Sequence, residues 1–303
     1  MTATESTSTT QSETTGWEIR RMSGSLGAEV HGVSLEGAST ADAGAIHQLL
    51  MEHQVLFFPD QHLSPDEHIA FGRHFGALEA HPNLAFDSER PEFFELRAKD
   101  GTGGIADEWH SDITFEQHPS KFAILQCRVA PEVGGDTMWM NAHKAFDELS
   151  EPMKDLCLGL TALHTAEAHL RPEKRRIHPV VRLHPETGRP SLFVNEHFTR
   201  RIVELSDAES DALLTFLTRW VQAPRFTVRY RWNAGTVAMW DNRCTQHHVL
   251  NDFEGERVIQ RVTVMGDDPE PAGELRYRPH GSKTATYYRD MAMREQLAAQ
   301  IEQ

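Results

Sequence analysis

FTVRYRW (residues 226–232) alternates strictly between apolar and polar side chains. A period of two is typical of a β-strand that presents one face to a core. The segments 236–240 and 257–265 also have the composition of strands, with the turn-forming residues 251–255 (NDFEG) between them. The last third of the chain is therefore strand-rich, which favours an antiparallel β core.

Helix signals lie mostly outside this region. Ser64 and Glu67 have the spacing of a capping box with Pro65 at the first helical position, and Ser206 and Glu209 repeat the capping signal. An apolar stripe over 213–221 continues the second of these helices, and apolar residues over 146–156 predict a third. The run 55–58 (VLFF) indicates a buried strand. Together these signals predict a mainly β protein with peripheral helices, of the α+β class.

Composition limits the functions that the chain can have. Its 303 residues include 39 % hydrophobic and 25 % charged residues, as in globular proteins. Thirty basic and 45 acidic side chains give a net charge of −15, which disfavours binding to a nucleic-acid polymer or an anionic membrane. No apolar run approaches the roughly 18 residues of a membrane span. Three cysteines without close pairing indicate a reducing compartment, so we expect a cytoplasmic protein.

The two ends of the chain differ from its body. Residues 1–16 are rich in Thr, Ser and Glu and are expected to be disordered. Residues 269–303 form a polar tail that ends in a predicted helix. That helix would dock on the body or on a neighbouring subunit of a homo-oligomer. Between the two ends we expect one domain over residues 17–268.

One pair of residues has the spacing of metal ligands. His110 and Asp112 stand at i and i+2, so on a strand their side chains would project from the same face. Nitrogen and oxygen donors with open positions suit iron(II) bound by two histidines and one carboxylate. A lone pair of this kind is common by chance. The second histidine would be His247, which follows the predicted strand 236–240.

Two arginines follow at strand spacing. Arg257 and Arg261 are four residues apart, so both guanidinium groups would lie on one face of a strand. Inside a pocket they would need carboxylate partners. The alternative is a pair of surface arginines in salt bridges.

Taken in order, these residues resemble the iron(II)/2-oxoglutarate-dependent oxygenases, most closely the taurine dioxygenase family. The resemblance runs from about Trp17 to Gly266. Further segments that carry it are 27–33 (GAEVHGV), 134–139 (GGDTMW), 193–196 (FVNE) and 240–243 (WDNR).

This family implies a double-stranded β-helix, or jelly roll, that holds iron between its sheets. Carried onto this chain, the iron ligands are His110, Asp112 and His247. Thr137 and Arg257 would hold the distal carboxylate of 2-oxoglutarate, with Arg261 beside its metal-chelating end. Dioxygen and 2-oxoglutarate would be consumed, and succinate and carbon dioxide released. His248, next to a ligand, is expected to have a structural role.

The resemblance also bears on the substrate. In taurine-specific relatives a histidine and the last arginine hold the sulfonate, and His81 and Arg261 match them. The two polar partners of the taurine amine are replaced by Leu84 and Ala106, so an anion without that amine is expected. Phe115 and Phe198 match apolar wall positions, with plain core packing as the alternative interpretation.

Several functions remain open at this point. The first is hydroxylation of a sulfonate, an alkyl sulfate or a similar small organic anion. The same chemistry on a phosphate, a phosphonate or a nucleotide is an alternative, as is a metal-binding jelly roll without turnover. The basic run 174–176 (KRR) is either a solvated surface or part of a lid over a larger anion. Desaturation and decarboxylation are not distinguished from hydroxylation.

Overall fold

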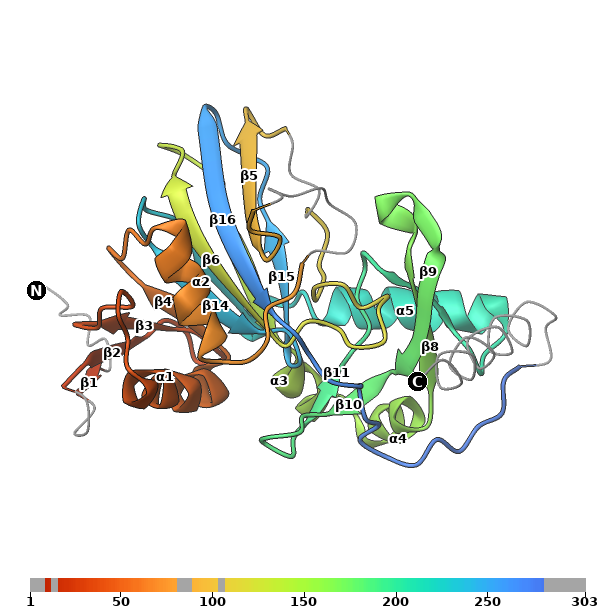
Figure 1. The fold of residues 1–303 in the computed structure, drawn as a ribbon. Coiled ribbons are helices and arrows are strands. Elements are labelled where there is room, and N and C mark those ends of the chain that lie inside the picture. The colour runs from red at the N-terminus through yellow and green to blue at the C-terminus, as the bar shows by residue number, and fades with distance from the viewer. Residues whose placement is uncertain (1–8, 12–15, 81–88, 103–106, 281–303) are drawn as a thin grey trace, which may run out of the picture. The chain divides into compact units, whose positions relative to one another are not determined.

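The alternating stretch forms strand β13 (Thr227–Tyr230), in which Val228 and Tyr230 are buried and Arg229 is exposed. The computed structural model describes residues 9–11, 16–80, 89–102 and 107–280 (Figure 1). The chain divides into two compact units, each built from three segments. Unit 1 comprises Met1–Asp107, Ser120–Asn141 and Pro224–Met265, and unit 2 comprises Glu108–Pro119, Ala142–Ala223 and Gly266–Gln303.

Unit 1 contains an eight-stranded sheet in the order β1-β2-β3-β4-β14-β6-β16-β5. Only the pair β3–β4 is parallel, and the other neighbours are antiparallel. The strands are β1 (Thr9–Gln11), β2 (Glu18–Arg21), β3 (Ala28–His31), β4 (Val55–Phe58), β5 (Phe93–Lys99), β6 (Phe122–Val129), β14 (Val237–Asp241) and β16 (Glu256–Val264).

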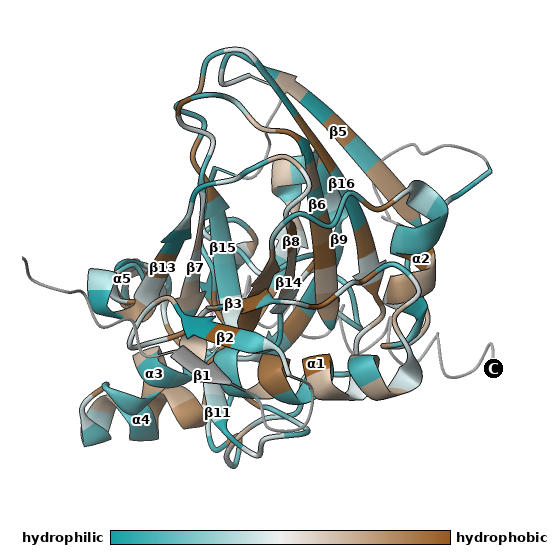
Figure 2. Cartoon of the chain, turned by 90° about the vertical axis from the view of Figure 1, so that its left-hand side faces the viewer, coloured by the Kyte–Doolittle hydropathy of each residue, from teal (hydrophilic) through white to brown (hydrophobic). Residues whose placement is uncertain are grey.

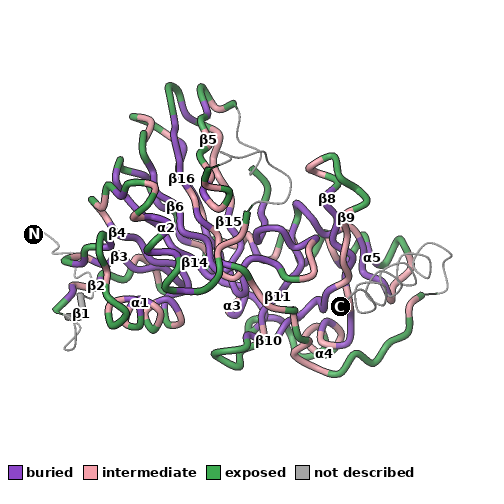
Figure 3. Tube along the Cα trace, viewed as in Figure 1, coloured by how far each residue is buried: buried purple, intermediate pink, exposed green. Residues whose placement is uncertain are grey.

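A second sheet of unit 1 has the order β13-β7-β15, with β7 (Thr137–Asn141) in the centre and β15 (Thr245–Val249) at one edge. One apolar cluster joins side chains of this sheet, such as Trp139 and Tyr230, to side chains of the larger sheet, such as Phe57 and Ile259. The two sheets therefore pack face to face with a shared core. Strand β14 is wholly buried, and β6 is buried except at its last two residues (Figure 3).

The other face of the large sheet is covered by α1 (Thr40–His53) and α2 (Pro65–Arg73). Their apolar residues, with Ile46 and Phe71 among them, share a cluster with Ile124 on β6 and Val262 on β16. Figure 2 shows hydrophobic residues along β6 and on α1. The capping box of Ser64 and Glu67 begins α2 as predicted.

Unit 2 contains small antiparallel sheets and the remaining helices. Its strands are β8 (Thr161–Ala166), β9 (Arg171–Pro179) and β12 (Thr199–Ile202) in one sheet and β10 (Val181–Leu183) and β11 (Pro190–Leu192) in another. Its helices are α3 (Ala142–Asp147), α4 (Glu151–Leu158), α5 (Asp207–Trp220) and the 3-10 turn η1 (Glu167–His169); a second such turn, η2 (Pro224–Phe226), precedes β13 in unit 1. Helix α5 begins at the predicted capping box and contacts β12.

The elements differ from the sequence predictions in three places. The single helix expected over 146–156 is two helices, because the backbone is extended at Ser150 and a new helix begins after it with a proline in its first turn. Strand β15 lies between the two strands that were expected to be joined directly. Residues 9–11 form β1, within a segment expected to be disordered, and the tail helix lies outside the described residues. The outcome is a mainly β protein with few helices, as predicted.

Candidate active site

His247 lies on β15 in unit 1, directly opposite Trp139 of β7. Directly paired residues of an antiparallel ladder point to the same side, so His247 shares the face of Trp139 that packs toward the large sheet. Its imidazole lies 4.8 Å from the Trp240 ring, centroid to centroid, and the residue is 4 % exposed. The histidine therefore points into the space between the two sheets, and its neighbour His248 points away from it.

Thr137 stands two residues before Trp139 on β7 and so faces the same space. Its hydroxyl oxygen accepts a hydrogen bond from Nε1 of the buried Trp232, at 2.9 Å. Just before it, Gly135 has φ +71°, and a Cβ atom there would lie 2.8 Å from Pro131 Cγ and 3.4 Å from Arg257 Cδ. The glycine thus lets the main chain pass close to the arginine.

Arg257 and Arg261 lie on β16 of the large sheet, on the same face as Ile259, a member of the core between the sheets. Arg257 is 3 % exposed, and its Nε and Nη2 atoms are buried without a hydrogen-bond partner among the described residues. Desolvation lowers the pKa of this guanidinium. Arg261 is partly buried, with its guanidinium carbon 5.8 Å from the centre of the Phe94 ring.

A buried guanidinium with two unsatisfied nitrogen atoms is costly unless an anion binds to it. A carboxylate would accept both N–H groups side by side, which is the strongest pairing available to arginine. The donor hydroxyl of Thr137 faces the same interior. Unit 1 therefore contains the elements of a carboxylate site in the same interior into which the imidazole of His247 points.

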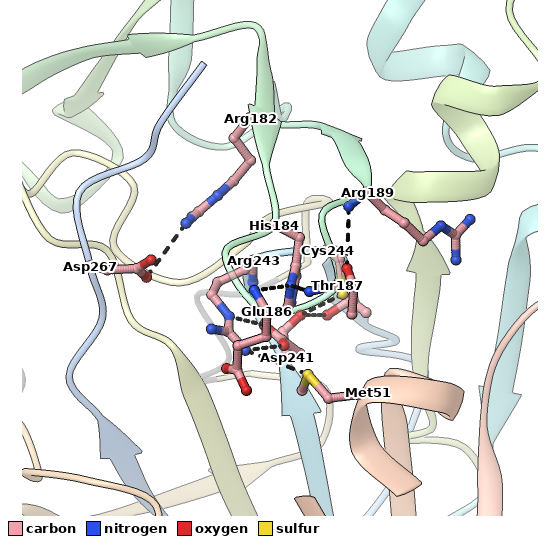
Figure 4. A network of polar contacts seen from close by, with 11 residues as sticks. Met51, Arg182, His184, Glu186, Thr187, Arg189, Asp241, Arg243, Cys244 and Asp267 are labelled. Carbon is pink, nitrogen blue, oxygen red and sulfur yellow. Dashed lines mark hydrogen bonds and ion pairs between the residues drawn. The ribbon is translucent and has the colours of Figure 1, made fainter. Parts of the chain in front are cut away.

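Residues 240–243 (WDNR) lead from the end of β14 into the turn before β15. Asp241 and Arg243 form a bidentate ion pair of 2.9 and 2.7 Å, and both are almost fully buried (Figure 4). The Asp241 carbonyl accepts a hydrogen bond from the Thr245 hydroxyl at 2.7 Å, and Trp240 Nε1 donates to Asn242 Oδ1. These contacts fold the chain from β14 into β15 and set the position of His247.

His110 and Asp112 belong to unit 2, in the segment Glu108–Pro119. The two residues do not share a strand, since His110 is a single bridge residue and Asp112 begins a turn in which Ile113 has φ 44°. His110 Nδ1 lies 2.7 Å from the carbonyl oxygen of Glu108. A carbonyl only accepts, so this nitrogen carries the proton and Nε2 is left as the metal-binding atom.

Phe115 and Phe198 also lie in unit 2 and contact each other edge to face at 5.1 Å, centroid to centroid. They form an apolar cluster with Ile113 and Ala166, and the Phe198 ring lies 6.2 Å from that of His110. The two phenylalanines therefore do come together beside a predicted metal ligand. The structure also adds His169, 5.7 Å from the Phe115 ring and 5.3 Å from the Phe198 ring.

The other sequence predictions concern three positions of the substrate site and the basic run 174–176. His81, Leu84 and Ala106 lie outside the described residues. The basic run 174–176 lies on β9 and is partly buried, and Lys174 forms an ion pair of 3.3 Å with Glu116. Elsewhere in unit 2, Arg182 approaches Asp267 at 3.5 Å (Figure 4).

Sequence reasoning missed three residues that shape these surroundings. The alternation over 226–232 predicts that Trp232 faces the core, but it does not reveal that the indole N–H orients Thr137. Gly135 belongs to the motif 134–139, but its closeness to Arg257 is visible only in the fold. His197, next to Phe198, hydrogen-bonds to Glu108, which is 89 positions away in the chain, so no local spacing reveals the contact.

Comparison with known proteins identifies the chain's relatives. The family model "Taurine catabolism dioxygenase TauD, TfdA family" matches residues 18–263. An alkylsulfatase of Acinetobacter baylyi is 35 % identical over 299 residues, covering 91 % of each chain. An alpha-ketoglutarate-dependent sulfate ester dioxygenase of Pseudomonas putida is 37 % identical over 276 residues, covering 83 % of this chain and 90 % of the relative.

Solved structures agree with these relatives. The crystal structure of a taurine dioxygenase from Burkholderia xenovorans superimposes with a TM-score of 0.76 at 33 % identity, covering 89 % of this chain and 97 % of that one. Within the described residues, no helix combines the length and the apolar character that crossing a membrane requires. The chain belongs to the TauD/TfdA family and is a 2-oxoglutarate-dependent dioxygenase, an oxidoreductase.

Proposed function

We propose that this enzyme uses Fe(II), 2-oxoglutarate and O2 to hydroxylate a sulfate ester or a sulfonate, with release of succinate and carbon dioxide. The observation that carries the proposal is the buried guanidinium of Arg257, with Nε and Nη2 unsatisfied by the described residues. A protein retains such a group where a ligand anion supplies the partner. We also propose that the mainly β architecture is a jelly roll.

The metal ligands in this proposal are His110 and Asp112 of unit 2 and His247 of unit 1. Each is buried and offers one ligand atom, an imidazole nitrogen or a carboxylate oxygen. Two imidazoles and one carboxylate suit Fe(II), and they leave coordination positions open for other ligands. When bound, the iron supplies dioxygen activation coupled to decarboxylation of 2-oxoglutarate. The protonated Nδ1 of His110 fixes the tautomer in which Nε2 binds the metal.

The cosubstrate would be held from the β16 and β7 strands. Arg257 would pair with the distal carboxylate of 2-oxoglutarate, and the Thr137 hydroxyl would donate to the same group. Trp232 already donates to the oxygen of the Thr137 hydroxyl, so the hydroxyl proton is directed toward another acceptor. Arg261, four residues along the same face, would lie beside the chelating end of the cosubstrate.

The relatives favour a sulfur-containing anion as the substrate, since two of them are named for alkyl sulfates or sulfate esters. His81 and Arg261 would hold the anionic head group. Phe115 and Phe198 would flank the carbon chain, in keeping with the apolar cluster that they form. Leu84 and Ala106 cannot pair with an ammonium group, so taurine should be a poor substrate. The phosphate-bearing substrates and the non-catalytic scaffold are not favoured by these relatives.

A substrate panel tests this proposal. An alkyl sulfate, an amine-free alkyl sulfonate, taurine and a phosphate ester are supplied at equal concentration with iron and 2-oxoglutarate, and succinate and oxidised product are both quantified. We expect the alkyl sulfate or the sulfonate to give the most product per succinate formed. Highest coupling with taurine or with the phosphate ester would contradict the proposed substrate class.

The proposal extends to the cell compartment. Cys127, Cys157 and Cys244 are buried and form no disulfide within the described part of the chain. Burial raises the pKa of the Cys127 thiol to about 11 and that of Cys157 to about 12, so both stay protonated and unreactive. Reduced cysteines and a requirement for Fe(II) both suit the cytoplasm, where we place the enzyme. We also propose that the enzyme forms a homo-oligomer.

A further inference from the structure

Glu108 contacts two histidines through two different groups. Its backbone carbonyl accepts a hydrogen bond from Nδ1 of His110 at 2.7 Å. Its side-chain carboxylate accepts one from Nδ1 of His197 at 2.8 Å. The side chain of Glu108 is 49 % exposed, whereas that of His197 is 6 % exposed. The partly exposed carboxylate of Glu108 is therefore hydrogen-bonded to the buried imidazole of His197, and Glu108 stands two residues before His110.

His197 is itself held firmly. Its carbonyl oxygen accepts a hydrogen bond of 2.8 Å from Nη2 of Arg200, and the Nε atom of Arg200 pairs with Glu167 at 3.0 Å. The backbone N–H groups of Glu196 and His197 both point to the carbonyl of Trp109, at 3.1 and 3.4 Å. The loop before β12 is thus hydrogen-bonded to both Glu108 and Trp109.

The ring of His197 also connects two parts of the site. Its centroid lies 5.4 Å from that of His110 and 4.5 Å from that of Phe198. All of these residues belong to unit 2. Moving His197 would therefore disturb both an imidazole assigned to the metal and a phenylalanine assigned to the substrate wall.

We propose that His197 and the Glu108 side chain are positioning residues: their hydrogen bond fixes the Glu108 backbone, and through it the orientation of the His110 imidazole against Phe198. The inference rests on the proposed function, in which His110 Nε2 is a metal ligand. Neither residue touches the metal in this arrangement. Partners that orient a metal-bound histidine from outside are commonly worth about 10–100-fold in metal affinity.

Direct metal binding tests this proposal without the need for turnover. Purified full-length protein is freed of metal and titrated with Co²⁺ under anaerobic conditions, following the visible absorption of the bound ion. Glu108→Ala keeps the backbone carbonyl that accepts from His110 and removes only the carboxylate. We expect it to raise the Kd for Co²⁺ by about tenfold and to change the absorption spectrum. Glu108→Gln, which keeps an acceptor oxygen, should recover most of the affinity.

Two further variants make the test specific. His197→Asn places an amide N–H near the position of Nδ1 and should bind Co²⁺ almost as the wild type does, whereas His197→Leu should behave like Glu108→Ala. Glu151→Ala breaks an exposed ion pair of unit 2, Glu151–Lys154 at 2.9 Å, and serves as the matched control without effect. Far-UV circular dichroism and the thermal midpoint check that every variant is folded.

The outcomes separate the inference from the proposed function. Unchanged Co²⁺ affinity and spectrum in both Glu108→Ala and His197→Leu would overturn the positioning role while leaving the metal site intact. Absence of Co²⁺ binding by the wild type would instead remove the metal role of His110, and the proposed function with it. Weaker binding confined to the two truncating variants supports the proposal.

Discussion

Trp232 donates a hydrogen bond from its indole Nε1 to the hydroxyl oxygen of Thr137, over 2.9 Å and in a fully buried setting. The oxygen is occupied as an acceptor, so the hydroxyl proton is directed to a different partner. This makes Thr137 a donor toward the interior between the two sheets of unit 1, where Arg257 also lies.

Thr137→Val should therefore have two separable effects. Loss of the donor should raise the Kd for 2-oxoglutarate by about tenfold, and the unpaired Trp232 N–H should lower the free energy of unfolding by about 1–3 kcal/mol. Adding Trp232→Phe removes the stranded donor, so the double variant should recover stability without recovering affinity. Urea unfolding and 2-oxoglutarate titration measure the two quantities. Recovery of both together would show that Thr137 acts only through packing.

Arg257→Met should stabilise the protein in the absence of 2-oxoglutarate. The substitution replaces a desolvated cation, whose pKa burial already lowers, by an apolar side chain of similar length. The gain should be about 1–2 kcal/mol, because a buried charge without a partner is unfavourable. The stabilisation that added 2-oxoglutarate gives the wild type should disappear.

Thermal unfolding with and without the cosubstrate measures both effects of Arg257→Met. Arg257→Ala should likewise raise the apparent constant for 2-oxoglutarate at least about tenfold and leave metal affinity nearly unchanged. An undiminished thermal response to 2-oxoglutarate in the Met variant would place the cosubstrate elsewhere.

His110→Ala, Asp112→Ala and His247→Ala should each fold and lose both iron and turnover, because three protein ligands hold the ion in a site of this type. His248→Ala is the matched control, since it alters the adjacent residue on the opposite face of β15. Iron content after anaerobic reconstitution is the measurement. A fully active variant among the three would exclude that residue from the ligand set.

Gly135→Ala should disturb the arginine site more than its backbone strain alone explains. Gly135 and Gly37 both have positive φ, +71° and +67°, but only the added methyl group at 135 meets neighbours, Pro131 and Arg257 among them. Both substitutions should cost about 1 kcal/mol for the left-handed backbone. The Gly135 variant alone should lose further stability and bind 2-oxoglutarate more weakly. Equal effects in the two variants would argue against close packing on Arg257.

Acidification should destabilise the protein through His68 on α2. Desolvation lowers the pKa of His68 from 6.5 to about 4, against a hydrogen bond to the Ile124 carbonyl that raises it. The unfolded chain therefore takes up a proton as the pH falls below 6.5 while the native state does not, and stability is lost down to about pH 4.

This histidine should contribute a loss of about 2 kcal/mol between pH 7 and pH 5. His68→Gln keeps a donor for the Ile124 carbonyl and cannot titrate, so its stability should fall less over the same range. Urea unfolding at pH 7, 6 and 5 compares the two proteins. Parallel pH profiles would show that His68 is not the group responsible.

Much of this protein follows from local sequence patterns. The period of two over 226–232, the capping boxes at Ser64 and Ser206 and the apolar run of β4 each specify an element through neighbouring residues alone. The order of the motifs identified the family, which the comparisons confirm. Patterns of this kind are readable because backbone geometry and side-chain periodicity are set within a few residues.

Only the tertiary structure decided how distant residues face one another. The spacing of His110 and Asp112 puts both on one face only if they lie on a strand, but Asp112 begins a turn, and His110 contacts Phe198 and hydrogen-bonds to the Glu108 carbonyl. The burial of Arg257 with no hydrogen-bond partner for Nε and Nη2 in the described part of the chain, the closeness of Gly135 and the donor role of Trp232 depend on strands far apart in the chain. Such contacts arise from the packing of one sheet on another, which no local pattern encodes.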